Sequence, residues 1–226
     1  MQDKAVIVTG AFGVLGGAVV GRLAEQGVRV AAVDVAEAPP HALPSGATPL
    51  GGYDLADPPA AGRAVEAAVA ALGKLDGLIN IAGGFAWETM AEGSAATWDR
   101  LYRMNVATCA NMCRAAIPHL IATRGRIVNI GAGGAVKAAA GMGAYAAAKG
   151  GVHRLTEALA DELKGKVGVN AVLPSIIDTP LNRKDMPKAD FAAWVSPADL
   201  AEVIAFLVSN KARAITGALV AVNGGV

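Results

Sequence analysis

Short apolar runs alternate along the chain with longer, alanine-rich segments in which apolar residues recur at helical spacing. The apolar runs predict strands, and their low charge indicates strands buried on both faces. The predicted strands cover residues 4–9, 28–34, 49–52, 75–81, 126–130, 167–173 and 218–222. The predicted helices cover residues 14–26, 60–72, 97–123, 144–163 and 197–208.

Strands that alternate with helices imply right-handed crossovers between parallel strands. We therefore expect an α/β fold: a single doubly wound, Rossmann-type parallel sheet with helices on both faces. Residues 1–226 suit a single domain, because the length fits one α/β domain and no repeat or linker interrupts the pattern. Such sheets bind ligands beyond the carboxyl ends of their strands, where the strand order reverses.

Composition narrows the possible partners and location. The net charge is +1 with no basic run, which argues against nucleic acid or an anionic membrane as partner. The sequence shows no secretory leader pattern and no span of about 20 apolar residues, so we expect a cytoplasmic protein. Cys109 and Cys113 stand one helical turn apart and are expected to be buried rather than to bind metal, and no metal site is expected.

A glycine-rich turn, TGAFGVLG at residues 9–16, joins the first predicted strand to the first helix. Gly10, Gly13 and Gly16 would allow the backbone to approach a pyrophosphate seated on the helix N-terminus. Asp34 ends the second strand, where a carboxylate accepts hydrogen bonds from a ribose diol and repels a 2′-phosphate. The cofactor expected from these residues is NADH, with NADPH less favoured.

Tyr145 and Lys149 are predicted to lie on one face of a helix, because residues four apart are neighbours there. A lysine near a phenol favours the phenolate and lowers the tyrosine pKa, so Tyr145 would exchange a proton near neutral pH. This pair is the candidate catalytic centre, with Tyr145 as proton donor.

These features resemble the short-chain dehydrogenase/reductase family over essentially the whole chain. The resemblance implies that Lys149 also holds the nicotinamide ribose and that Asn105 supports a proton-relay water. The resemblance further implies cofactor contacts from Asp54 and Leu55 beside the adenine, from Asn80, Ala82 and Gly83 after the fourth strand, and from Thr179 at the carboxamide. Relatives pair through two long helices, so we expect a homodimer or homotetramer acting on a small-molecule substrate.

The sequence departs from the family pattern at three positions. Val14 replaces the middle glycine of the turn, while Gly13 stands one place earlier, and Ser175 replaces a glycine after Pro174. The serine that polarises the substrate carbonyl lies 13 residues before the tyrosine in the family, and Ala132 stands there. Losing one donor to a developing oxyanion costs about 2.7–4 kcal/mol of barrier.

One branch of the family, dihydropteridine reductase, lacks this serine, and the second half of the chain resembles it. The similar segments are residues 82–85, 148–153 and 178–187, followed by Trp194. The resemblance implies NADH-dependent reduction of a quinonoid dihydropterin, whose conjugated ring needs less polarisation, under a lid at residues 180–195. Phe85, Trp87 and Trp194 would either stack on a flat heterocycle or pack the lid.

Two other interpretations stay open. In the first, the protein is a general carbonyl or quinone reductase in which water, a backbone amide or Lys137 replaces the serine. In the second, it is a catalytically weak NAD-binding scaffold, although retention of Asn105, Tyr145 and Lys149 speaks against that. His153 is interpreted as structural, packed behind the catalytic helix.

Overall fold

The computed structural model describes residues 1–226 and contains one seven-stranded sheet in which every neighbouring pair is parallel. The strand order is β3-β2-β1-β4-β5-β6-β7, so the order reverses between β1 and β4, as the doubly wound topology requires. The strands are β1 (Ala5–Thr9), β2 (Arg29–Val33), β3 (Ala47–Leu50), β4 (Gly77–Asn80), β5 (Arg126–Ile130), β6 (Gly168–Pro174) and β7 (Leu219–Val222).

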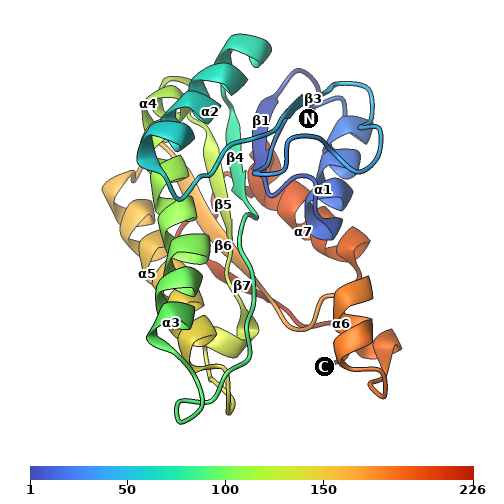
Figure 1. Ribbon diagram of the computed structural model, residues 1–226. Helices are drawn as coiled ribbons and strands as arrows, with labels where there is room; N and C mark the ends of the chain where they lie inside the picture. The colour runs from blue at the N-terminus through green and yellow to red at the C-terminus, as the bar shows by residue number, and fades with distance from the viewer.

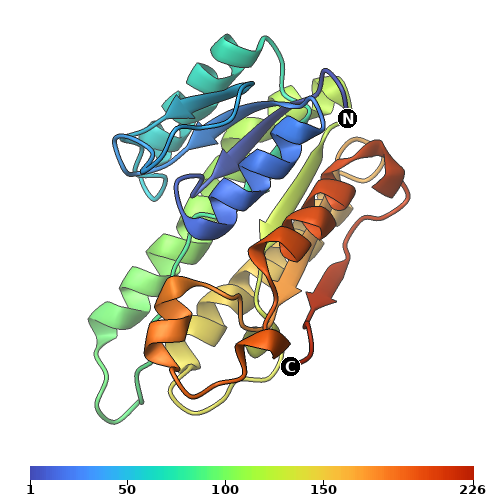
Figure 2. The ribbon, with the colours of Figure 1, turned by 90° about the vertical axis from the view of Figure 1, so that its right-hand side faces the viewer.

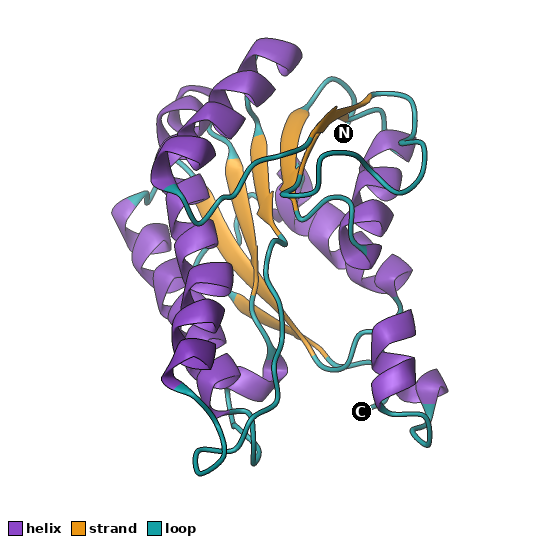
Figure 3. Ribbon diagram, viewed as in Figure 1, coloured by secondary structure: helices purple, strands orange, loops and turns teal.

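Helices cover both faces of this sheet (Figure 1; Figure 3). One layer holds α2, α3, α4 and α5, and the other holds α1 and α7, which lie side by side in Figure 2. The helices are α1 (Val14–Glu25), α2 (Pro58–Leu72), α3 (Ala95–Tyr102), α4 (Thr108–Thr123), α5 (Gly143–Glu162), α6 (Pro180–Asp185) and α7 (Pro197–Val208). None of them is long and apolar enough to cross a membrane.

Two separate cores follow from the alternation of side chains along each strand. Ile7 of β1 and Leu78 of β4 point toward α2 and α4, whereas Val8 and Ile79, the next residue of each strand, point toward α1 and α7. Because both faces are buried, the strands read as continuous apolar runs, which explains why the sequence pattern located them.

The third strand lies two residues earlier than expected. It spans Ala47–Leu50 rather than residues 49–52, because the chain turns sharply at Gly51 and Gly52. Gly52 has φ +79°, and a Cβ on Gly51 would lie 2.1 Å from the carbonyl oxygen of Glu37. Pro49 is tolerated inside β3 since this strand is at the edge of the sheet.

The long helix expected at residues 97–123 is interrupted. It begins at Ala95, with the hydroxyl of Ser94 accepting a hydrogen bond from the Thr97 amide, and residues Arg103–Ala107 form a π-helical turn between α3 and α4. Single π turns inside α-helices occur frequently at functional sites. Here the π turn contains Asn105.

Residues 180–195, expected as a substrate lid, begin with the short helix α6. Arg183 donates two hydrogen bonds to Asp178, at 2.5 and 2.7 Å, and its guanidinium lies 4.9 Å from the centre of the Phe191 ring. Trp194 packs on Phe191 with ring centres 4.8 Å apart. These contacts give the segment an ordered internal structure.

Candidate active site

A cavity of about 2080 Å³ opens beyond the carboxyl ends of the strands. It collects most of the residues that the sequence singled out. Those lining it are Gly10, Gly13, Gly16, Asp34, Asp54, Leu55, Ala82, Gly83, Tyr145, Lys149 and Thr179.

The glycine-rich turn packs closely against the loop after β4. Gly10 has φ +62°, and a Cβ there would lie 2.9 Å from the amide nitrogen of Ala82. A Cβ on Gly16 would lie 2.1 Å from the carbonyl oxygen of Gly10, so both positions require glycine. The hydroxyl of Thr9 accepts hydrogen bonds from the amides of Ile81 and Ala82 at 3.0 and 3.1 Å, which fixes the two loops together.

The turn leads into the N-terminus of α1, where the first backbone amides of a helix have no partner within it. Gly13 is the residue before that helix, and Val14, at its first position, is half exposed beside the cavity. Gly13 is not crowded, since a Cβ there would meet only the Gly10 carbonyl oxygen, at 3.4 Å. The departure from the family pattern therefore leaves the helix N-terminus open to an anion.

Asp34 has a structural task besides the predicted one. Its carboxylate accepts hydrogen bonds from the amides of Phe12, at 2.9 Å, and Ala36, at 3.1 Å. The side chain thus holds the glycine-rich turn at the end of β2 while it lines the cavity. The neighbouring residues Phe12 and Val35 carry no cationic group that would attract a 2′-phosphate.

Asp54 and Leu55 line the same end of the cavity. The Asp54 carboxylate accepts a hydrogen bond from the Ala56 amide at 2.9 Å, and the Leu55 carbonyl accepts one from Asn111 of α4 at 3.1 Å. Thr179 also lines the cavity. It is the residue before α6, and its hydroxyl oxygen accepts a hydrogen bond from the Asn182 amide at 3.2 Å.

Tyr145 and Lys149 both lie on α5 and reach the cavity. Burial raises the pKa of Tyr145 to about 12, and burial lowers the pKa of Lys149 to about 8. The Lys149 ammonium donates a hydrogen bond to the carbonyl of Ile130 at 2.8 Å. The pKa of Tyr145 is raised, not lowered as expected, because desolvation of the phenol dominates. Tyr145 stays protonated through neutral pH, as a proton donor must.

Asn105 holds the loop after β4 from inside the π turn. Its amide nitrogen donates to the carbonyls of Gly84 and Leu101, at 3.1 and 3.0 Å, and its amide oxygen accepts from the Gly84 amide at 3.2 Å. A Cβ on Gly83 would lie 2.5 Å from this oxygen and 3.4 Å from the Lys149 ammonium. Glycine at position 83 therefore lets Asn105 and Lys149 approach the same point of the backbone.

Asn80 does not reach the cavity. Its side chain is buried between the sheet and α4, where it donates hydrogen bonds to Asn129 of β5, at 2.9 Å, and to the sulfur of Cys113 of α4, at 3.3 Å. Cys109 and Cys113 are both free and buried, as expected, and a hydrogen bond with the Cys109 thiol, together with burial, raises the pKa of Cys113. In this structure Asn80 supports β4 and β5 from within the core.

Ala132 lines the cavity at the end of β5, and no serine or threonine occurs in the sequence between residues 125 and 155. Its amide donates a hydrogen bond to Nε2 of His153 at 3.2 Å. His153 is buried on α5, one turn after Lys149, and burial, Arg154 and Lys149 lower its pKa while Glu157 opposes them. His153 is buried as expected, and its contact with Ala132 could not be predicted from the sequence.

Two of the three candidate stacking residues lie at the cavity. Phe85 and Trp87 line it, and the Phe85 ring meets the Tyr145 ring edge to face with centres 4.9 Å apart. Trp194 is only 7% exposed and packs in the lid, so the idea that it stacks on a substrate is wrong. No group of three or more His, Cys, Asp or Glu side chains is arranged to hold a metal ion.

A model of the short chain dehydrogenase family matches residues 4–190 of the sequence. The chain belongs to the short-chain dehydrogenase family. Curated relatives include a D-threitol dehydrogenase of Mycolicibacterium smegmatis, 32% identical over 100% of this chain and 93% of its own length. Nodulation protein G of Azospirillum brasilense is 33% identical over 100% of this chain and 99% of its own.

Solved structures of the family agree. A 3-ketoacyl-(acyl-carrier-protein) reductase from Brucella melitensis, complexed with NADH, has a TM-score of 0.88 at 31% identity and covers 99% of this chain and 98% of its own. A short-chain dehydrogenase/reductase of the same organism, described as a glucose/ribitol dehydrogenase, reaches a TM-score of 0.92 at 28% identity, over 100% of this chain and 97% of its own. The protein is an oxidoreductase of this family with a nicotinamide cofactor.

The residues present fit a dinucleotide. Gly10 and Gly16 have no side chain to keep a dinucleotide away from the backbone of the turn. The free N-terminus of α1 can accept its pyrophosphate, and the Asp34 carboxylate can accept hydrogen bonds from its ribose diol. Lys149, 6% exposed, supplies a cation next to Gly83.

Proposed function

We propose that this dehydrogenase is an NADH-dependent reductase of planar, conjugated acceptors, and that its substrate is a quinonoid dihydropterin. The observation that carries the proposal is that Ala132 and Phe85 line one cavity with Tyr145. A methyl group stands where the family pattern has a polarising hydroxyl, and the Phe85 ring, its centre 4.9 Å from that of Tyr145, lies close enough to the proton donor to stack on a flat substrate.

The Ala132 site has no ready substitute for the missing donor. Its own amide is engaged with His153, and Lys137, considered from sequence as a replacement, does not line the cavity. An isolated ketone would therefore lack the donor that the family pattern supplies at position 132 and depend more strongly on Tyr145. A quinonoid ring is already electron-poor, so it tolerates the loss of about 2.7–4 kcal/mol that one absent oxyanion donor represents.

When bound, NADH supplies a hydride to the acceptor. The protein's own residues then have separate tasks. Tyr145, protonated through neutral pH, donates the proton to the reduced acceptor, and the Lys149 charge stabilises the phenolate left behind. Asp34 and the amides at the start of α1 hold the dinucleotide, and Thr179 begins the lid that excludes water.

A second candidate is reduction of a quinone, which is equally planar and preactivated. The relatives favour carbonyl chemistry in general, since one of them is described as a 3-oxoacyl-[acyl-carrier-protein] reductase from Thermotoga maritima, 29% identical over 100% of this chain. Another, of Xanthobacter autotrophicus, is described as an inactive dehydrogenase and is 33% identical over 77% of this chain. A chain without turnover that still binds the cofactor is therefore a real outcome to test.

The test is NADH oxidation with quinonoid 6,7-dimethyldihydropterin, compared between the unmodified protein and Tyr145→Phe. We expect rapid turnover in the first and a loss of at least ~100-fold in kcat in the second, with the dissociation constant of NADH unchanged in fluorescence titration. Pterin turnover absent from the unmodified protein, or undiminished by Tyr145→Phe, would contradict the proposal.

A further inference from the structure

The segment between β4 and α3 crosses to the loop before α5 at Trp87. The indole Nε1 donates a hydrogen bond to the carbonyl of Ala140 at 2.9 Å, and the amide of Glu88 donates one to the carbonyl of Gly141 at 2.8 Å. The two loops are therefore joined close to the start of the helix that carries Tyr145.

The indole of Trp87 packs directly against the backbone of Gly141. The φ of +76° at Gly141 disfavours any side chain, and a Cβ there would lie 2.1 Å from Cε2 and 2.3 Å from Nε1 of Trp87. The indole thus rests directly on the backbone at Gly141. The rest of the ring is uncovered, since Trp87 is 60% exposed and lines the active-site cavity.

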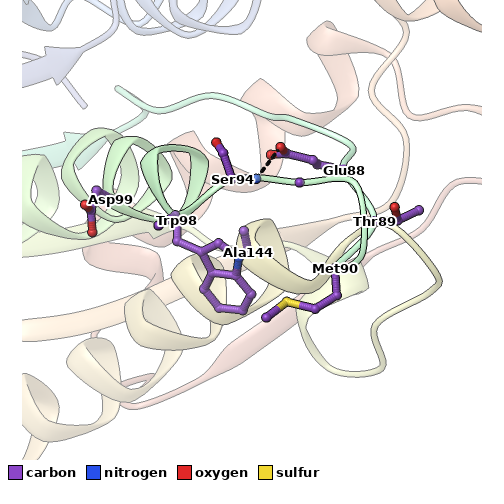
Figure 4. Close-up of a pocket in the computed structure, with 9 residues that line it drawn as sticks. Glu88, Thr89, Met90, Ser94, Trp98, Asp99 and Ala144 are labelled. Atoms are coloured by element: carbon purple, nitrogen blue, oxygen red, sulfur yellow. Dashed lines mark hydrogen bonds between the residues drawn. The ribbon is translucent and has the colours of Figure 1, made fainter.

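A second cavity, of about 410 Å³, lies near this contact. Glu88 and Ala144, the residues next to Trp87 and Tyr145 in the chain, line it. Figure 4 shows Trp98 and Met90 around Ala144, and the Glu88 carboxylate accepting the Ser94 amide at 2.6 Å. We call this space the outer pocket.

The two cavities converge on the same wall. Asp99 of α3 lines both of them, whereas Trp87 and Tyr145 line only the active-site cavity, and Glu88 and Ala144 line only the outer pocket. Adjacent residues of the chain, Trp87 with Glu88 and Tyr145 with Ala144, thus face different cavities, so the chain at these two places is part of what separates the site of chemistry from the outer pocket.

We infer that Trp87 determines substrate size: its indole limits the acceptor to a compact ring and blocks substituents from extending toward the outer pocket. The inference rests on the proposed function, because it takes the acceptor to be a planar ring held beside Phe85 and Tyr145. Replacing the indole with a small side chain joins the two cavities, and a long substituent then finds room next to Met90 and Trp98.

The test compares two pterins that share one ring system, 6-methylpterin and folic acid, which carries a long aromatic tail at the same position. Their dissociation constants are measured by calorimetry on the NADH-saturated protein. We expect the unmodified protein to bind 6-methylpterin more tightly. In Trp87→Ala the ratio of the folic acid constant to the 6-methylpterin constant should fall by at least ~10-fold.

Gly141→Ala provides an independent route to the same change, because its methyl group must displace the indole from this backbone. Met90→Ala is the matched control: Met90 is 83% exposed and lines only the outer pocket, so the ratio should stay the same. Trp87→Phe keeps a ring without the hydrogen bond and should preserve most of the discrimination.

An unchanged ratio in both Trp87→Ala and Gly141→Ala, or failure of the unmodified protein to bind either pterin, would overturn the inference. The proposed function fails separately, if size discrimination in binding persists while quinonoid dihydropterin is not turned over.

Discussion

At position 132 an alanine lines the cavity where the family pattern has a serine, and this single difference sets the expected choice of acceptor. Adding the hydroxyl back should help the acceptors that need polarisation. We expect Ala132→Ser to raise kcat/KM for an aryl ketone at least ~10-fold, part of the effect of one oxyanion donor. The same change should alter kcat/KM for quinonoid dihydropterin by less than about 3-fold.

The control for this experiment is Ala135→Ser, a substitution in the same short turn that does not line the cavity. A gain confined to Ala132→Ser assigns the effect to the restored donor. Equal gains for the ketone and the pterin would show that the missing serine does not determine the acceptor.

Lys149 illustrates a charge kept at the expense of stability. Its pKa falls from 10.5 to about 8 on burial, which corresponds to a penalty of about 3 kcal/mol at neutral pH. We therefore expect Lys149→Met to raise the free energy of unfolding at pH 7, by about 3 kcal/mol at most, while turnover collapses. The loss of the hydrogen bond to the Ile130 carbonyl reduces the gain.

The pH dependence of this gain has a definite sign. Between pH 8 and 10.5 the native lysine is neutral while the unfolded lysine still binds a proton, so the native protein gains stability as pH rises. The advantage of Lys149→Met should shrink over that range in urea unfolding experiments. A constant or growing advantage would contradict the assigned burial of the charge.

At the scale of elements, α5 is attached to the end of β5 by two side chains one helical turn apart. Lys149 donates to the carbonyl of Ile130, and His153 accepts from the amide of Ala132. The second bond requires a neutral imidazole, which the lowered pKa of His153 favours. Together these contacts fix the Tyr145 helix against the strand end that lines the cavity.

Removing the acceptor should leave the buried Ala132 amide without a partner. We expect His153→Leu to cost about 1–3 kcal/mol in the free energy of unfolding, and His153→Gln, which keeps an acceptor, to cost less. Urea denaturation of the two variants measures the difference. Equal losses would mean that packing, rather than this hydrogen bond, accounts for the contribution of His153 to stability.

For the whole molecule, the sequence predicted the parts that rest on periodicity and glycine geometry. The order of helices and strands, the packed turn at Gly10 and Gly16, and the approach of Tyr145 and Lys149 to one cavity all follow from local patterns. The π turn did not, because a single inserted residue leaves the apolar stripe of a long helix nearly unchanged.

Features that depend on contacts between residues far apart in the chain could not be predicted from the sequence either. Trp194 is buried because it packs on Phe191 within the lid segment, which the ion pair between Asp178 and Arg183 also holds together. The contact of Trp87 with Gly141 joins segments that are more than fifty residues apart in the chain. The direction of the Tyr145 pKa likewise depends on its burial in the assembled site.

The most direct test of the central claim is a side-by-side measurement of kcat/KM for quinonoid dihydropterin, a quinone and an aryl ketone, each with NADH and NADPH. The account predicts that the pterin is fastest, that the ketone is slowest, and that NADH is preferred because Asp34 lines the cavity. An aryl ketone reduced as fast as the pterin, or NADPH used as well as NADH, would contradict it.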